Sequence, residues 1–128
     1  VGNRQALRSS PAALDTARIL LEHIDAALQG HGYSQVTVNI HGEKAQEVAE
    51  RIAANPMTRG LQGPTVSPIY GTESAWQTVT VIISDKHLLR AVEYFRDLGG
   101  TQVIVVPVQS IFLDQSPTFA RLQQFLTT

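Results

Sequence analysis

Histidines are the side chains of this sequence that are best suited to chemistry, because the chain contains no cysteine. The four are His23, His31, His41 and His87, and neither His23 nor His87 has a partner four residues away that would make a zinc pair. We interpret these two as surface residues. His41 differs because it ends a predicted strand just before Gly42 and a predicted helix, a position where ligands often sit. His41 is therefore a candidate ligand-binding residue, and a solvated loop residue is the alternative interpretation.

Sequence signatures of catalysis are absent. The chain has no Walker-type loop, no GxSxG motif, no metal signature and no paired acids in an obvious cleft. An acylphosphatase-like enzyme needs an arginine in the loop after its first strand, where this chain has His41, Gly42 and Glu43. We predict no catalytic residue and no metal site, and the residues favour a binding or regulatory module that oligomerises.

Composition excludes several classes of partner. The 128 residues are 43% hydrophobic and 16% charged, which is typical of one globular domain or of one domain with an attached piece. Ten basic and eleven acidic side chains give a net charge of -1, so binding to nucleic acid or to an anionic membrane is not expected. No apolar run is long enough to span a bilayer. The chain begins with Val1 and not with Met, so we expect a fragment of a longer protein.

Alternating apolar residues predict the strands. Residues Gln35–His41 and Trp76–Ile83 alternate strictly, which indicates two half-buried strands. The β-branched residues of Thr65–Ile69 and the valines and isoleucines of Thr101–Val108 predict two more. Val1–Arg8 is interpreted as the tail of a further strand whose partners lie outside this chain.

Apolar residues at steps of three and four predict the helices, and capping residues mark their ends. Ser10 and Pro11 begin a long helix that Gly30 and Gly32 end. A second helix follows Gly42 and stops at Asn55-Pro56. Ser84-Asp85 caps a third, which Gly99-Gly100 closes, and Ser116-Pro117 caps a last one.

The order strand–helix–strand–strand–helix–strand predicts an α+β, ferredoxin-like βαββαβ fold with strand order 4-1-3-2, an N-terminal helix and a C-terminal helix. Pro68 and Pro107 fall in strands two and four, which this order places at the edges, where proline is tolerated. Both inner helices should cover one face of the sheet. The residues predicted on the other face are Thr37, Asn39, Trp76, Thr78, Thr80 and Ile82. We expect this open face, or the apolar fourth strand, to meet another subunit.

Two runs of residues carry a resemblance to a known family. The run Leu61–Ile69 (LQGPTVSPI) and the run Leu98–Val108 (LGGTQVIVVPV) resemble the C-terminal regulatory domain of long-form ATP phosphoribosyltransferases, which open histidine biosynthesis. The resemblance covers most of the chain. It implies that residues 1–32 are the strand and helix closing the catalytic region, that 33–112 are the regulatory domain, and that 113–128 are a tail helix similar to that of plant-type members.

The resemblance implies a regulatory function without catalysis in this segment. Such enzymes assemble as hexamers with regulatory domains in threes, and L-histidine binds between the domains as a feedback inhibitor. The implied partners are therefore L-histidine and further copies of the chain, as a trimer or a hexamer. No cofactor is implied here, although the parent enzyme would use Mg²⁺. The location would be the cytoplasm, or the plastid stroma for a plant-type protein.

The same resemblance assigns ligand contacts residue by residue. The implied histidine-binding residues are His41, Gly42, Leu61, Thr65, Ile82, Gly100, Thr101 and Gln102. Family members often carry an acid at the end of the first strand, where this chain has Asn39, His41 and Gly42, followed by Glu43. Two alternatives stay open: a stand-alone trimeric sensor of the nitrogen-signalling or copper-tolerance type, and a purely structural oligomerisation domain.

Overall fold

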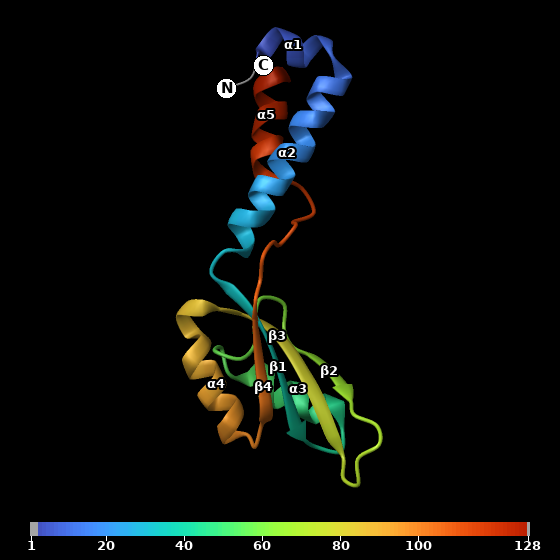
Figure 1. Ribbon diagram of the computed structural model, residues 1–128, viewed down its shortest axis with the longest axis vertical. Coiled ribbons are helices and arrows are strands. Elements are labelled where there is room, and N and C mark those ends of the chain that lie inside the picture. The colour runs from blue at the N-terminus through green and yellow to red at the C-terminus, as the bar shows by residue number, and fades with distance from the viewer. Residues whose placement is uncertain (1–2, 128) are drawn as a thin grey trace. The chain divides into compact units, whose positions relative to one another are not determined.

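Residues 3–127 are described by a computed structural model, and they form two compact units. One unit is the continuous segment Gly32–Val108, and the other joins the helical residues before it to the tail after it. Figure 1 shows the helices and strands of each unit. No helix within residues 3–127 has the length and the apolar character that a membrane span requires.

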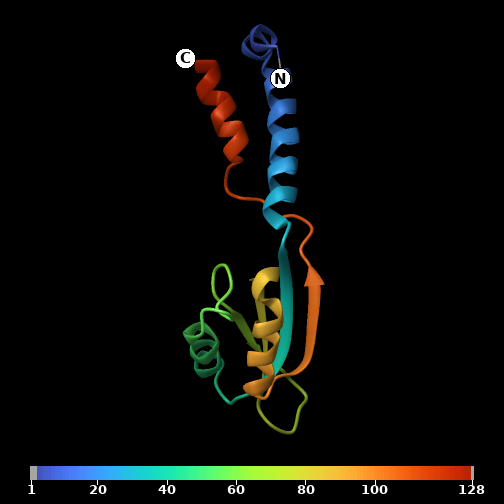
Figure 2. The same cartoon turned by 90° about the vertical axis from the view of Figure 1, so that its left-hand side faces the viewer.

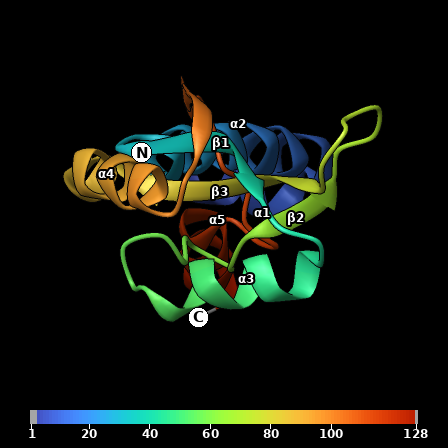
Figure 3. The ribbon, with the colours of Figure 1, turned by 90° about the horizontal axis from the view of Figure 1, so that it is seen from below.

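The segment Gly32–Val108 holds a four-stranded antiparallel sheet. Its strands are β1 (Tyr33–His41), β2 (Thr65–Pro68), β3 (Trp76–Ser84) and β4 (Thr101–Pro107), and their spatial order is β2-β3-β1-β4. Read from the other edge this is 4-1-3-2, so the predicted ferredoxin-like order is confirmed. Pro68 and Pro107 lie at the ends of the two edge strands, as expected from their missing N–H groups. Figure 3 shows β3 running between β1 and β2.

Two helices cover one face of this sheet, as predicted. They are α3 (Ala45–Ala54) and α4 (Leu88–Asp97), and Figure 2 shows both on the same side of the strands. Val48 and Ile52 of α3, and Ala91 and Phe95 of α4, are completely buried. They pack into one cluster with the inward-facing residues of the two central strands, which are Val36, Val38, Ile40, Val79, Val81 and Ile83. Burying each valine, isoleucine or phenylalanine of this cluster contributes roughly 1.5–3 kcal/mol.

The opposite face of the sheet carries side chains that pair with each other across the strands. The hydroxyls of Thr37 and Thr80 lie 3.4 Å apart, and the Thr78 hydroxyl donates to the Asn39 carboxamide at 3.0 Å. Neighbouring β4 exposes Ile104 and Val106 by about half of their surface. Within its own unit this face is not covered by a helix, as Figure 2 shows.

The start of α4 corrects one prediction. The chain first makes a short 3₁₀ turn, η1 (Asp85–His87), and the Ser84 hydroxyl makes no capping hydrogen bond. The Asp85 carboxylate instead accepts a hydrogen bond from the Ser34 hydroxyl at 2.6 Å, and the backbone amide of Asp85 donates to the Gly32 carbonyl at 2.8 Å. Asp85 therefore ties this turn to the beginning of β1, an interaction between distant residues that capping rules do not include.

The other unit contains α1 (Arg4–Ser9), α2 (Pro11–Gly30) and α5 (Pro117–Thr127). Ser10 caps α2 and Ser116 caps α5 through their hydroxyls, as predicted. The strand expected over Val1–Arg8 is wrong for the described residues, because Arg4–Ser9 is helical, and Val1 and Gly2 lie outside them. The Asn3 side chain accepts a hydrogen bond from the Ala6 amide, so a local cap decides in favour of helix.

Candidate functional site

The predicted ligand residues fall into two groups on the sheet, not into one cluster. His41, Gly42 and the turn Gly100–Gln102 lie where β1 ends and β4 begins. Leu61 and Ile82 lie toward the other end, where β3 finishes, and Thr65 lies between the two groups, because it pairs with Thr80, which is opposite Thr37 in the middle of β1. On β1, His41 pairs with Trp76 and Gln35 pairs with Ile82. Six residue steps along β1 separate these two pairs, which corresponds to about 20 Å.

The first group is built on the end of β1. The His41 ring meets Trp76 edge-on at a centroid distance of 5.4 Å, and the Arg51 guanidinium reaches the His41 carbonyl at 3.4 Å. Gly42 is held on both sides, because its amide donates to the Ala75 carbonyl at 3.0 Å and its carbonyl accepts from the Gln77 side chain at 3.1 Å. His41 is therefore an exposed imidazole on a rigid strand end with a cation beside it.

The glycine turn before β4 completes this group. A Cβ atom on Gly100 would lie 2.5 Å from the Phe95 carbonyl oxygen and 2.7 Å from a Val38 methyl, so only glycine fits there. Gln102 has a positive φ of 53°, which is unusual for a residue with a side chain. The register of β1 with β4 shifts between Thr37 and Asn39, so β4 carries a bulge at this point.

The bulge directs a polar cluster onto the open face. The Asn39 amide group donates to the Gln102 side-chain oxygen at 3.4 Å, and Asn39 lies opposite Thr101 in the ladder. Carboxamides and a hydroxyl can both donate and accept, so this end of the sheet suits the charged ends of an amino acid. The sequence placed Asn39 on the open face and marked it as a departure from the family pattern, and the register places it at the centre of this cluster.

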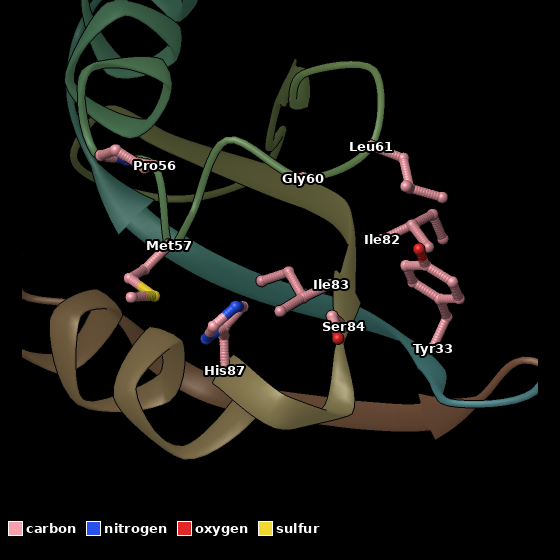
Figure 4. A pocket seen from close by; sticks show the side chains of 9 residues that line it. All are labelled: Tyr33, Pro56, Met57, Gly60, Leu61, Ile82, Ile83, Ser84 and His87. Carbon is pink, nitrogen blue, oxygen red and sulfur yellow. The ribbon is translucent and has the colours of Figure 1, made fainter.

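The second group has a different character. The Leu61 amide donates to the Ile82 carbonyl at 3.1 Å, and Thr65 pairs with Thr80 in the β2–β3 ladder. Gly60 brings the loop close to β3, because a Cβ on it would lie 2.9 Å from the Ile82 carbonyl oxygen and its φ is +75°. Leu61 and Ile82 line a hollow of about 160 Å³ together with Met57 and His87 (Figure 4). This end therefore offers apolar contact more than charge recognition.

Sequence reasoning missed the remaining walls of this hollow. Tyr33, Met57, Ser84 and His87 line it, and His87 was interpreted only as a surface histidine. No periodicity brings these residues together, since they come from β1, the loop after α3, the end of β3 and η1. Among residues 3–127 no three histidines or acids gather in a way that could hold a metal ion.

Comparison with known proteins gives one family. The family model described as "HisG, C-terminal domain" matches residues 31–110. "ATP phosphoribosyltransferase 1, chloroplastic" of Arabidopsis thaliana is 36% identical over 95% of this chain, and the Arabidopsis protein named "ATP phosphoribosyltransferase 2, chloroplastic" is 35% identical over the same share. The ATP phosphoribosyltransferase of Bradyrhizobium diazoefficiens is 27% identical over 91%. The chain spans about a third of the length of these relatives, 31% for the two plant proteins and 33% for the bacterial one.

Proposed function

The chain belongs to the HisG C-terminal domain family, and from this premise we propose that it is the regulatory domain of an ATP phosphoribosyltransferase. In this function it binds L-histidine, the end product of the pathway that the enzyme opens, and it assembles with copies of itself. The chain carries no active site of its own under this proposal. The chloroplastic names of the two plant relatives favour the plastid stroma as its location over the cytoplasm.

The separation of the two groups of ligand residues is the observation that carries the proposal. A free amino acid is far shorter than the roughly 20 Å between the two ends of β1. One histidine therefore cannot touch His41 and Ile82 of the same chain. A site that uses both groups needs two copies, with the apolar end of one facing the polar end of the other. This arrangement explains why the resemblance assigns contacts to both ends of a single sheet.

The exposed β4 edge supports self-association. Ile104, Val105 and Val106 are 55%, 39% and 52% exposed, and they lie on an edge strand whose outer hydrogen-bonding groups are free to pair. Apolar edges of this kind promote association with another chain. We propose a trimer of regulatory domains, or a hexamer of the whole protein, in which the open faces and β4 edges lie at the contacts.

Inhibition then follows from a shift between quaternary arrangements. Histidine that bridges two copies binds better to the arrangement that brings the two groups together, and it increases the population of that arrangement. A difference in binding free energy of roughly 1–3 kcal/mol between the arrangements would give useful feedback. The ligand acts here at a distance from the catalytic region, so it needs no contact with the substrates of the enzyme.

Calorimetric titration of the oligomeric chain with L-histidine tests the proposal. We expect saturable heat and a raised melting temperature. Leu61→Ala removes a contact of the apolar group, and Thr101→Val removes a contact of the polar group. Each substitution should weaken L-histidine binding about tenfold, or about 1.4 kcal/mol. Mixing the two variants and allowing subunits to exchange should restore part of the tight binding, because some interfaces then combine two intact halves.

Three outcomes separate this proposal from its alternatives. Restoration on mixing supports a site shared between copies, whereas single variants that weaken binding without restoration indicate a site within one chain. An oligomer that assembles normally and gives no heat with L-histidine contradicts the histidine site. That result would favour a purely structural oligomerisation domain.

A further inference from the structure

The hollow at the end of the sheet is larger than the contacts assigned to it require. It measures about 160 Å³ and lies where β1 begins and β3 finishes, under the loop that follows α3. A cavity that holds one water needs about 10–15 Å³ of such space, so this one accepts a group of several heavy atoms. Leu61 and Ile82 are the predicted ligand residues in its lining, and the other seven lining residues have no assigned role.

The lining of this hollow is mainly apolar with a few polar groups, a composition that suits a ring. Figure 4 shows the His87 ring directed toward Met57 and Ile83, with the Ser84 side chain and the Tyr33 ring on the far side. The Met57 thioether and the Ile83 side chain provide soft apolar surface, and a thioether makes favourable contacts with aromatic rings. The His87 nitrogens and the Ser84 hydroxyl are the polar groups that could orient such a ring.

The lack of charged residues in the lining favours a neutral ring over a cationic side chain as the occupant of the hollow. None of the nine residues that line the hollow is an acid, a lysine or an arginine. The nearby Asp85 carboxylate is engaged by the Ser34 hydroxyl at 2.6 Å. A cationic side chain such as that of lysine or arginine would therefore lose hydration without meeting a counter-charge in the lining itself. A neutral imidazole carries one donor and one acceptor, which match a histidine and a hydroxyl.

We propose that this hollow is the subsite for the imidazole ring of the ligand, and that Met57, Ser84 and His87 are its specificity-determining contacts. The inference rests on the proposed function, since it divides one bridging histidine between two copies. The ring enters the hollow of one copy, and the charged ends meet the polar cluster around Asn39 and Gln102 of the next. Selection for a small heteroaromatic ring then lies in residues that no sequence motif marks.

The composition of the chain allows a direct test. Met57 is the only methionine, so labelling with ¹³C-methyl methionine gives a single signal that reports from the wall of the hollow. We expect 4-methylimidazole and L-histidine to shift this signal, and glycine, which has no ring, to leave it in place. All three compounds are titrated into the whole chain under the conditions in which it is oligomeric.

Variants of His87 measure its contribution. His87→Ala should weaken L-histidine binding about tenfold, and His87→Gln, which keeps a donor and an acceptor, should recover part of the loss. Leu89→Ala is the matched control, because Leu89 is 70% exposed on the first turn of α4 and does not line the hollow. The affinity of the Leu89→Ala variant for L-histidine should be unchanged. A merely structural role of His87 would not be rescued by glutamine in this way.

The outcomes for the subsite and for the function are distinct. Heat with L-histidine, an unmoved Met57 signal and unchanged affinity in His87→Ala would overturn the subsite and leave the proposed function standing. A shift with 4-methylimidazole but no heat and no shift with L-histidine would support a ring-binding hollow and contradict the histidine function. No shift with either probe would overturn the subsite.

Discussion

Each of the two compact units of this chain is stabilised in a different way. Gly32–Val108 has a core of ten buried apolar side chains, of which Phe95 is the largest. The helical unit buries few side chains and leaves Leu20, Ile24 and Leu28 of α2 from 46% to 70% exposed. The difference indicates that the sheet unit carries most of the stability, and that the helical unit depends more on individual polar contacts.

Those polar contacts converge on Asp25 of α2. Its carboxylate accepts hydrogen bonds from the Ser116 hydroxyl, from the Thr118 amide at 3.0 Å and from the Thr118 hydroxyl at 2.8 Å. The Ser116 hydroxyl in turn caps α5 by accepting from the Phe119 amide at 3.1 Å. These hydrogen bonds connect the start of α5 to α2 through the side chain of Asp25. We call Asp25, Ser116 and Thr118 the Asp25 clasp.

The largest effect should come from removing the centre of the sheet unit's core. Phe95→Ala leaves a cavity between α4 and the sheet and should lower the free energy of unfolding by about 3–5 kcal/mol. Urea unfolding followed by the fluorescence of Trp76, the only tryptophan, measures this loss. The exposed Leu89→Ala should change it by less than about 0.5 kcal/mol. Equal effects of the two substitutions would refute the described packing of α4.

A matched pair of glycines compares how rigid the two units are. Gly100→Ala places a methyl group 2.5 Å from the Phe95 carbonyl and should cost the sheet unit about 1–3 kcal/mol. Gly30→Ala places one 2.8 Å from the Ser110 backbone, which lies in a segment outside helix and strand. There the gain in helix propensity, up to about 1 kcal/mol, should offset part of the strain.

Amide hydrogen exchange measured unit by unit distinguishes these two results. Faster exchange is expected in β1 and α4 for Gly100→Ala, and little change in α2 for Gly30→Ala. A larger loss of protection in the helical unit than in the sheet unit would reverse the comparison.

The smallest effect should be the dependence of the Asp25 clasp on pH. The hydrogen bonds from Ser116 and then from Thr118 lower the pKa of Asp25 below its ordinary value of 3.8. Because the folded form has the lower pKa, the stabilisation is complete above the ordinary value and is lost as the pH falls through the lowered one. Acidification should therefore release the start of α5 while the sheet unit is still folded.

An acid titration followed by the amide signals of Thr118 and Phe119 checks this expectation. Asp25→Asn should perturb these signals at neutral pH and remove their titration, since the amide side chain does not ionise. Asp15→Asn is the control, because Asp15 pairs with Arg18 of the same helix at 3.1 Å. A titration of the α5 amides that persists in Asp25→Asn would rule out the clasp as its source.

Local patterns predicted the fold well, because each depends on neighbouring residues. The alternation of Val36, Val38 and Ile40 predicted the buried face of β1, and all three are fully buried. Pro68 and Pro107 predicted the edge strands through a missing donor. The strand predicted over Val1–Arg8 is wrong, because the sequence there has no clear alternation and the side chain of Asn3 caps a helix. The division of the chain at residues 32 and 112, the histidine contacts and the assembly stay predictions.

The sequence by itself determined which side chains face inward, since the twofold repeat of a strand and the repeat of a helix are properties of the local backbone. It also determined the family, through the runs around Gly63-Pro64 and Gly99-Gly100. Only the tertiary structure decided that His41 and Ile82 lie at opposite ends of one sheet, and that Met57 and His87 share a hollow. The reason is that antiparallel pairing joins residues about forty positions apart in a register that no local pattern specifies.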